Sequence, residues 1–318
     1  MRIQIITPAN PFRVSGNQIT ANRWSRILRL LGHQVRVKHS LDNSPYDLII
    51  GLHAWRNAKH ILNAHGQYPE KPIIVCLTGT DLYRDIYYHS SAQRVLKLAD
   101  RLIVLHPNGS ANLPHSLRKK TRVILQSLEG KKRMANPPKK GFDVCVVANL
   151  RPEKDPFRAA MASRLLSKSS KLRVIHLGDC SNEKMLARAQ AEMKRNHRYK
   201  WIGPKSWGQT LREISRHRAL VITSKLEGGA NVVSEAIVES VPVISSDNSG
   251  SIGILGKNYP GIFPQGETRT LAKLLNRLEN EPGFHERLQA ICQSIAPMFD
   301  PQLEIESWEN LLREMGLS

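Results

Sequence analysis

Short apolar runs alternate along the chain with segments whose apolar positions recur at helical spacing. Residues 19–31 show the helical pattern, with apolar and arginine positions at helical spacing, and this segment ends at Gly32. The apolar runs of the first half are residues 2–9, 34–40, 47–53, 72–79, 101–107 and 122–127. Strands that alternate with helices in this way are typical of α/β folds with parallel sheets.

The alternation restarts in the second half, after the basic, proline-containing segment 131–140, which we interpret as a linker. The later strand-like runs are residues 143–150, 172–178, 200–203, 219–224 and 241–246. Residues 301–316 form a last amphipathic segment, with Leu303, Trp308, Leu311 and Leu312 along one side. We therefore expect two Rossmann-like domains whose parallel sheets face each other across a cleft.

The boundaries follow from these two series. We predict a first domain over residues 1–138 and a second over residues 139–299. A terminal helix over residues 300–318 follows, and it could cross back to the first domain. A chain of 318 residues that is 41% hydrophobic can bury the cores of two such domains.

The first residues and the spacing of the cysteines indicate the compartment of the protein and the redox state of its thiols. MRIQIITPAN runs directly into a strand-like segment, and no apolar run approaches the roughly 18–20 residues of a membrane span. The cysteines, Cys76, Cys145, Cys180 and Cys292, form no CxxC pair. We expect reduced thiols in a cytoplasmic protein without an integral membrane segment.

Positive charge is concentrated in the first half. Residues 1–140 contain 23 Lys and Arg against 7 Asp and Glu, a net of +16, whereas residues 141–318 have a net of only +4. This asymmetry indicates an anionic ligand for the first half, with an ordinary solvated basic surface as the alternative. Nucleic acid is the obvious candidate, yet the chain has no helix-turn-helix, zinc-finger or RNP-type pattern.

Phosphate chemistry is suggested first by VVANLRPEKDP, residues 146–156. It ends a predicted strand and then presents Arg151 and Lys154, a guanidinium fork and a compact ammonium that could neutralise a diphosphate. The alternative is a solvent-exposed turn. Neither a GxGxxG turn nor a GxxxxGK[ST] loop is present, so ordinary dinucleotide and P-loop sites lose support.

A second motif, SKLEGGANVVSEA at residues 224–236, combines two carboxylates with a glycine-containing turn before a helix. Backbone N–H groups in Gly228, Gly229, Ala230 and Asn231 could approach a phosphate closely. Glu227 could reach a cleft, and Glu235, about one turn into the helix, could accept hydrogen bonds from a diol such as ribose. An ordinary turn followed by a favourable acid near the helix start is the alternative.

Together these two motifs resemble the retaining GT-B glycosyltransferases of family 4. The resemblance implies that Arg151 and Lys154 bind the nucleotide diphosphate, that Glu227 contacts the transferred sugar and that Glu235 holds the ribose. The family's glycine-containing first loop corresponds to residues 10–20, which makes Gly16 and Asn17 part of the donor site. These implied roles make Glu227, Arg151 and Lys154 candidate catalytic residues.

A narrower resemblance, to the selenosugar synthases of selenoneine biosynthesis, extends over almost the whole chain. Its motifs are SGNQITANRW (15–24), GLHAWRNA (51–58), LTGTDLYRDI (77–86), VVANLRPEKDP, EGGANVVSEA and GSIGILGKNYPGIFPQG (250–266). It implies transfer from UDP-N-acetylglucosamine or UDP-glucose to selenophosphate, giving a 1-selenosugar. We expect UDP-sugar and selenophosphate as partners, no metal or other cofactor, and no nucleic acid.

Selenophosphate is small and multiply anionic, so the basic first half has a use. Candidate acceptor residues at predicted strand ends are Arg13, Arg56, Thr78, Thr80, Asp81 and Arg84. His53 also ends a strand and is our remaining candidate catalytic residue, through a polar contact to sugar or acceptor, although it could be a satisfied structural histidine. Asp81 could orient Arg84 or a sugar hydroxyl.

Two alternatives remain open at this point. An ordinary family 4 enzyme acting on a lipid or glycan acceptor would need exposed apolar or amphipathic helices in the first domain, and the basic segment 21–32 keeps this open. A nucleic-acid-binding protein would fit the isoelectric point of about 10.1. That second alternative gives no reason for the EGGANVVSE segment.

Overall fold

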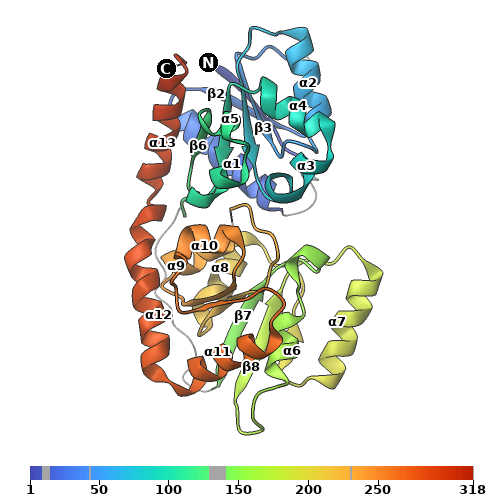
Figure 1. Cartoon of the computed structure of the whole chain (residues 1–318), viewed down its shortest axis with the longest axis vertical. Coiled ribbons are helices and arrows are strands. Elements are labelled where there is room, and N and C mark those ends of the chain that lie inside the picture. The colour runs from blue at the N-terminus through green and yellow to red at the C-terminus, as the bar shows by residue number, and fades with distance from the viewer. Residues whose placement is uncertain (9–14, 43, 129–140, 230, 318) are drawn as a thin grey trace. The chain divides into compact units, whose positions relative to one another are not determined.

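The structure is a computed structural model that describes residues 1–8, 15–42, 44–128, 141–229 and 231–317. Its contacts divide the chain into two compact units. The first unit comprises Met1–Ser127, Glu227–Gly229 and Asp300–Ser318, and the second comprises Leu128–Leu226 and Ala230–Phe299. The boundary predicted at residues 138 and 139 lies outside the described residues. Figure 1 labels helices and strands of both units.

The first unit is built around a parallel six-stranded sheet in the order β2-β1-β3-β4-β5-β6. The strands are β1 (Arg2–Ile6), β2 (Gln34–Lys38), β3 (Leu48–Leu52), β4 (Ile73–Leu77), β5 (Arg101–Val104) and β6 (Thr121–Val123). Every strand predicted here is confirmed, and each ends earlier than the apolar run that predicted it. The extra residues at the carboxyl ends of those runs lie in the segments that follow the strands.

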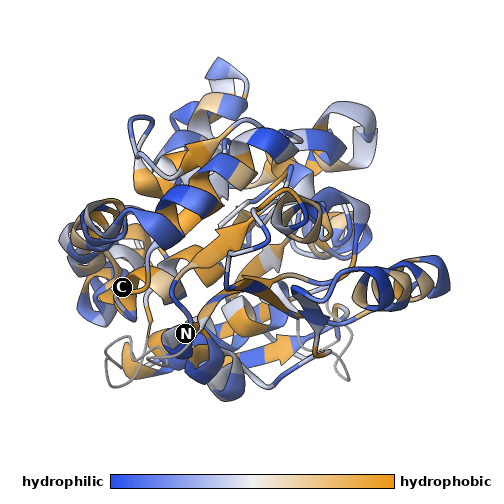
Figure 2. Cartoon of the chain, turned by 90° about the horizontal axis from the view of Figure 1, so that it is seen from below, coloured by the Kyte–Doolittle hydropathy of each residue, from blue (hydrophilic) through white to orange (hydrophobic). Residues whose placement is uncertain are grey.

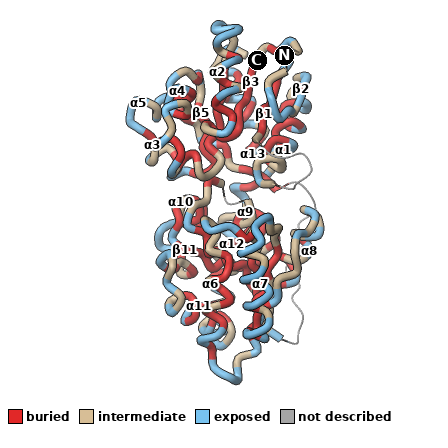
Figure 3. Tube along the Cα trace, turned by 90° about the vertical axis from the view of Figure 1, so that its right-hand side faces the viewer, coloured by how far each residue is buried: buried red, intermediate tan, exposed pale blue. Residues whose placement is uncertain are grey.

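Helices cover both faces of this sheet. On one face α1 (Gly16–Leu30) and α13 (Pro301–Glu314) pack in a cluster that includes Ile74 and Cys76 of β4. The other face carries the next residues of the same strand, Ile73, Val75 and Leu77, against residues of α2 (Ala58–Gln67) and α4 (Ser90–Leu98). Burial on both faces explains why the strands are continuous apolar runs instead of alternating ones. Strands are correspondingly hydrophobic in Figure 2 and buried in Figure 3.

The first helix uses its apolar side for the core of this unit. Trp24, Ile27 and Leu28 of α1 are at most 2% exposed, and Leu30 is the exposed apolar side chain of its last turn. The amphipathic character of residues 21–32 is therefore explained by packing within the unit. None of the described helices is both long and apolar enough to cross a membrane.

The last helix joins the first unit through a buried polar contact. Trp308 meets Trp24 edge to face, with ring centroids 4.8 Å apart. Glu304, only 2% exposed, accepts hydrogen bonds from Trp24 Nε1 (2.9 Å) and from the backbone N–H of Ser127 (2.7 Å). The prediction that Leu303 shares the buried side of this helix is wrong, because Leu303 is 46% exposed. The helical period places Glu304 on that side with Trp308, Leu311 and Leu312.

The second unit also contains a parallel six-stranded sheet, in the order β12-β11-β10-β7-β8-β9. Its strands are β7 (Phe142–Val147), β8 (Leu172–Leu177), β9 (Tyr199–Trp201), β10 (Leu220–Ile222), β11 (Val243–Ser246) and β12 (Ile262–Phe263). Its α-helices are α6 (Arg158–Ser163), α7 (Glu183–Arg195), α8 (Trp207–Arg216), α9 (Asn231–Val238), α10 (Ser249–Leu255), α11 (Thr268–Asn280) and α12 (Pro282–Ile295). The sequence did not predict β12, whose two residues are too few to form a recognisable run.

The strand order defines where each unit can hold a ligand. In the second sheet the chain moves outward from β7 in one direction to β8 and β9 and then returns to place β10 on the other side of β7. In the first sheet the corresponding reversal lies between β1 and β3. At such a point the loops after neighbouring strands diverge, and ligands of open α/β sheets bind there, at the carboxyl ends of the strands.

A buried histidine lies on β8 of the second unit. His176 is fully buried, with Nε2 2.8 Å from the carbonyl oxygen of Ala148 and Nδ1 2.9 Å from the hydroxyl of Tyr199. Because the carbonyl can only accept, Nε2 carries the proton and Nδ1 accepts from Tyr199. Burial lowers the pKa of His176 from 6.5 to about 4, so this ring is neutral in the folded protein at pH 7.

This pKa predicts an acid-sensitive contribution to stability. Between pH 6.5 and about 4 the unfolded chain binds a proton at residue 176 and the folded chain does not. The free energy of unfolding should therefore fall as the pH falls through this window, by up to about 1.4 kcal/mol per pH unit from this group. His176→Gln keeps a donor and an acceptor but does not titrate, so urea unfolding should show a flatter pH dependence for this variant.

The matched control is His197→Gln, because His197 lies in the same unit with an exposed side chain. It should retain the wild-type pH dependence. The same pH dependence in His176→Gln as in the wild type would contradict the assignment of a neutral buried ring.

Candidate functional site

The loop after β7 carries the two candidate phosphate ligands of the second unit. Arg151 precedes a short 3₁₀ turn, Pro152–Lys154, and Asp155 ends that turn in a left-handed conformation with φ of 42°. Arg151 is exposed, and its side chain makes no hydrogen bond or ion pair with any part of the chain that the structure describes. Its guanidinium is thus available to an anion. Lys154 is half-buried on the same turn.

The loop after β10 holds this turn in place. The Thr223 hydroxyl lies 3.1 Å from the carbonyl oxygen of Lys154 and 3.0 Å from that of Asp155, and Thr223 is 3% exposed. The backbone N–H of Lys225 donates to the carbonyl of Glu153 over 2.8 Å. The loops that follow neighbouring strands β7 and β10 are therefore joined by hydrogen bonds at the point where the strand order reverses.

Close packing supports the same loop from its other side. Gly178, directly after β8, has φ of 153°, and a Cβ there would lie 1.9 Å from the carbonyl oxygen of Ala148. A side chain at this position would collide with the backbone at the end of β7. Glycine thus lets β8 end against the start of the loop that carries Arg151.

Glu235 lies on α9, which begins at Asn231 after the β10 loop. Its carboxylate is 4% exposed and accepts a hydrogen bond from Trp207 Nε1, at the first position of α8, over 2.9 Å. A buried carboxylate needs such donors because burial removes its water. Asn231 has a buried Oδ1 atom without a hydrogen-bond partner among the described residues.

The other predicted residues of this motif are placed as follows. Glu227 and Gly229 are half-buried and Gly228 is buried, and these three residues group with the first unit. Ala230 lies outside the described residues. The predicted role of Glu227 at the transferred sugar stays a prediction, as do the roles of the glycines.

In the first unit, His53 follows β3 in a left-handed conformation, with φ of 72°. Positive φ is unusual for a residue with a side chain and is often found at functional sites. The ring is 3% exposed. Nδ1 accepts from the backbone N–H of Arg56 (3.3 Å), so Nε2 carries the proton and donates to the Thr80 hydroxyl (3.2 Å), which in turn donates to Asp85 (3.0 Å). Burial lowers the pKa of His53, although Asp81 opposes this shift.

This arrangement changes the expected role of His53. Both ring nitrogens are occupied by protein partners and the ring is almost completely buried, which favours the alternative of a structural histidine. His53 can position Thr80, which is half-buried, and the backbone at Arg56, which is an exposed residue. In this structure it does not present a free nitrogen to a substrate.

Asp81 is the centre of the loop after β4. It is completely buried, and its carboxylate accepts from the backbone N–H groups of Ala54 (3.0 Å), Thr78 (3.3 Å) and Gly79 (2.8 Å). These contacts tie the β3 and β4 loops together and do not expose an oxygen to a sugar hydroxyl. Arg84 donates instead to Asp85 over 2.8 Å, at the end of a π-helical turn over Asp81–Asp85.

The remaining candidates are less constrained. Gly16 is exposed and Asn17 half-buried at the start of α1, which is capped by Ser15 accepting from the backbone N–H of Gln18. A Cβ on Gly16 would meet no atom within 4 Å, so packing does not require glycine there. Thr78 is half-buried beside Asp81. Arg13 lies outside the described residues.

Three residues that the sequence analysis overlooked contribute to these clusters: Trp207, Thr223 and Asp85. Thr223 could have been found as the hydroxyl at the end of the strand-like run 219–224. Asp85 lies within the TGTDLYRD motif. Trp207 was harder to find, since it is 28 residues from its partner and lies beyond the predicted strand 200–203.

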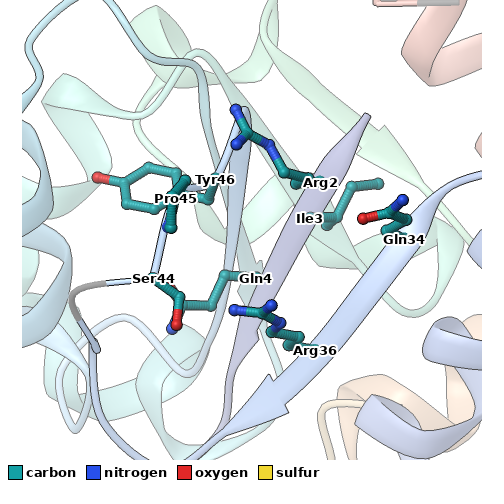
Figure 4. A pocket seen from close by; sticks show the side chains of 8 residues that line it. All are labelled: Arg2, Ile3, Gln4, Gln34, Arg36, Ser44, Pro45 and Tyr46. Atoms are coloured by element: carbon teal, nitrogen blue, oxygen red, sulfur yellow. The ribbon is translucent and has the colours of Figure 1, made fainter.

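A small surface pocket in the first unit lies elsewhere. Figure 4 shows its lining residues, Arg2, Ile3, Gln4, Gln34, Arg36, Ser44, Pro45 and Tyr46. Arg2 and Gln34 are the first residues of β1 and β2, so the pocket belongs to the amino-terminal ends of these strands. The acceptor candidates follow the carboxyl ends of β3 and β4. Within the described residues, no group of three His, Cys, Asp or Glu side chains could hold a metal ion, and all four cysteines are free.

Comparison with solved structures identifies the class of fold. HepE from Anabaena, in complex with UDP and glucose, is 15% identical, and the alignment covers 99% of this chain and 100% of HepE with a TM-score of 0.79. Sucrose-phosphate synthase from Thermosynechococcus elongatus is 16% identical over 99% of this chain and 98% of that enzyme, with a TM-score of 0.80. The lipopolysaccharide outer core galactosyltransferase WaaB is 15% identical, with a TM-score of 0.69. The fold is GT-B, as predicted.

Family membership follows from the sequence of the second unit. The model of the family described as glycosyl transferases group 1 matches residues 129–293, more than half of the chain. The chain belongs to this glycosyltransferase family. No curated protein matches it. The matched region contains Arg151, Lys154, Glu227 and Glu235.

The joined loops give a direct test of the site's construction. Thr223→Val removes the hydroxyl that serves two carbonyls while keeping the shape of the side chain. We expect the backbone amides of residues 151–157 and 223–226 to exchange with deuterium about five- to tenfold faster, as for the loss of one hydrogen bond. Hydrogen exchange followed by mass spectrometry measures this.

Thr121→Val is the matched control, since the Thr121 hydroxyl donates to the carbonyl of Leu117 in the first unit. It should leave exchange in both loops of the second unit unchanged. Unchanged exchange in Thr223→Val as well would mean that the hydroxyl does not hold the loops together.

Proposed function

We propose that this protein is a selenosugar synthase: a glycosyltransferase that moves a hexosyl group from UDP-glucose or UDP-N-acetylglucosamine to selenophosphate. The observation that carries the donor half of the proposal is the pair of joined loops at the β7–β10 reversal. One of these loops carries Arg151, whose guanidinium has no hydrogen-bond or ion-pair partner among the described residues. The acceptor half rests on the motif resemblance and on the net charge of +16 in residues 1–140.

The donor diphosphate is assigned to Arg151 and Lys154. A guanidinium can bind two phosphate oxygens at once, and a nearby ammonium adds a second charge. Negative charge on the diphosphate grows as the bond to the sugar breaks, so these cations stabilise the transition state more than the ground state. In this proposal Arg151 and Lys154 supply the positive charge and no metal ion is required. HepE, which shares the fold, has been solved with UDP-glucose as well as with UDP.

The nucleoside and the sugar are assigned to the second motif. Glu235 would accept hydrogen bonds from the ribose hydroxyls, because a carboxylate has several acceptor positions on its two oxygens. Asn231 Oδ1, buried without a partner in the described residues, is suited to a sugar hydroxyl. Glu227 would contact the transferred sugar beside its reacting carbon.

The reaction forms one bond as another breaks. The selenium of selenophosphate attacks C1 of the sugar, and the electrons of the C1–O bond leave with UDP. Water then hydrolyses the P–Se bond, releasing inorganic phosphate and the 1-selenosugar. Selenium in selenophosphate is already strongly nucleophilic, so correct positioning matters more than a general base. This fits His53, whose nitrogens are occupied.

An uncharged glycan or lipid acceptor is the competing possibility. Such an acceptor would need an exposed apolar or amphipathic helix in the first domain, and the apolar side of residues 21–32 instead lies in the core of the first unit. Arg56 and Arg84, which follow β3 and β4, are exposed and basic. Such side chains favour a compact anion.

The proposal is tested by product analysis. Purified protein is incubated with selenophosphate and a panel of UDP-sugars, and the products are analysed by mass spectrometry. We expect UDP, phosphate and a sugar that carries one selenium atom. Transfer to a glycan or lipid acceptor, with no selenium-containing product, would reject selenophosphate and keep the donor assignment. No consumption of any UDP-sugar under any condition would reject both.

Arg151→Ala tests the donor site by itself. Loss of one charged donor to the leaving diphosphate should lower kcat by about 10²-fold or more. Steady-state release of UDP at saturating donor measures the effect. Arg216→Ala is the control. Arg216 is an exposed arginine at the carboxyl end of α8. A helix that connects parallel strands runs back to the amino-terminal ends of the strands, so this end of α8 lies away from the proposed site. Wild-type turnover in Arg151→Ala would refute the assigned role.

A further inference from the structure

Trp207 is a tryptophan whose N–H group is aimed at the carboxylate proposed to hold the ribose. Nε1 donates to Glu235 Oε1 over 2.9 Å, from the first residue of α8 to the middle of α9. Glu235 is 4% exposed, whereas the Trp207 side chain is half-buried. The contact therefore lies at the border between the interior of the second unit and its surface.

The position of the indole is fixed by the start of its helix. Ser206 caps α8 by accepting from the backbone N–H of Gln209 (3.4 Å), and the Gln209 side chain accepts from the backbone N–H of Ser206 (3.0 Å). This reciprocal pair is a capping box, which satisfies two otherwise unpaired donors and defines where the helix begins. Trp207, between the two partners, is carried by a rigid turn.

A rigid donor restricts the rotation of the carboxylate it contacts. The hydrogen bond from Trp207 to Oε1 restricts the rotation of the Glu235 carboxylate, and with it the direction in which the carboxylate oxygens can accept further hydrogen bonds. A ribose has two neighbouring hydroxyls, and their O–H groups must point toward the carboxylate oxygens in order to donate to them. Pre-orientation of this kind lowers the entropic cost of forming the ligand's hydrogen bonds.

We propose that Trp207 is a positioning residue for donor recognition: it orients Glu235 and so makes the site selective for a nucleotide with an intact ribose diol. The inference rests on the proposed function, in which Glu235 binds the ribose. Trp207 does not itself touch the reacting atoms. Its effect should appear in the preference for ribose over dideoxyribose and not in the binding of the diphosphate.

The experiment compares equilibrium binding of UDP and of 2′,3′-dideoxy-UDP by calorimetry. Wild-type protein should prefer UDP. Trp207→Phe keeps an aromatic ring but removes the N–H, and should reduce this preference about tenfold, as for the loss of one hydrogen bond to a charged group. Its affinity for 2′,3′-dideoxy-UDP should stay within about twofold of the wild type, because the phosphate ligands are unchanged.

Trp201→Phe is the matched control. Trp201 is another half-buried tryptophan of the second unit, and its Nε1 donates to the carbonyl of Gly178 over 3.0 Å instead of to a carboxylate. Removing that N–H should leave the preference for UDP unchanged. A folded Trp207→Phe protein with the full wild-type preference would overturn the inference.

Glu235→Ala separates this inference from the proposed function. If Glu235→Ala loses the preference for UDP while Trp207→Phe keeps it, only the role of Trp207 fails. If Glu235→Ala also keeps it, the assignment of Glu235 to the ribose fails. Should Trp207→Phe not fold, the indole N–H resonance of Trp207 in the wild-type protein decides: it should shift with UDP more than with 2′,3′-dideoxy-UDP, and equal shifts would overturn the inference.

Discussion

The hydroxyl of Thr223 holds together the two loops on which the proposed chemistry depends. It contacts the carbonyl oxygens of Lys154 and Asp155, and the N–H of Lys225 adds a bond to Glu153. In a parallel sheet, loops after neighbouring strands that run to opposite sides have no ladder of hydrogen bonds to join them. Side-chain and loop contacts must do so. Here they fix the turn that carries Arg151 and Lys154, while Arg151 keeps its guanidinium uncommitted within the described residues.

The first unit uses its polar groups differently. Asp81 is completely buried and accepts three backbone N–H groups, and the nitrogens of His53 contact Thr80 and the backbone of Arg56. These side chains shape the loops after β3 and β4 instead of offering themselves to a ligand. The same loops also carry two exposed basic side chains, Arg56 and Arg84. A rigid polar interior with exposed cations suits a small anion whose own reactivity needs no general base.

Much of the fold could be predicted because both faces of each sheet are covered, which makes the strands continuous apolar runs that stand out in the sequence. The strand β12 has only two residues and gives no such signal. Leu303 was misassigned because hydrophobicity alone could not show that a carboxylate, Glu304, occupies the buried position of that helix turn. Burial of a charged group is decided by partners distant in sequence, in this case Trp24 and Ser127.

The residues of the candidate site also differ in whether local sequence or tertiary packing determines their contacts. Arg151, Lys154 and Glu235 were predictable from local motifs, because strand ends and helix starts place them at one edge of a parallel sheet. The contact of Trp207 with Glu235 was not, since it depends on how α8 and α9 pack. His53 and Asp81 were found by position, but a location at a strand end does not reveal that their polar atoms have partners within the protein.

Hydrogen exchange of the wild-type protein with and without saturating UDP tests most directly the central claim that the β7–β10 reversal is a nucleotide site. The account predicts that UDP protects residues 148–157, 205–210 and 223–239, and leaves peptides from residues 1–8 and 34–128 at their ligand-free rates. Protection confined to residues 1–8 and 34–128, or none at a UDP concentration that saturates binding, would contradict it.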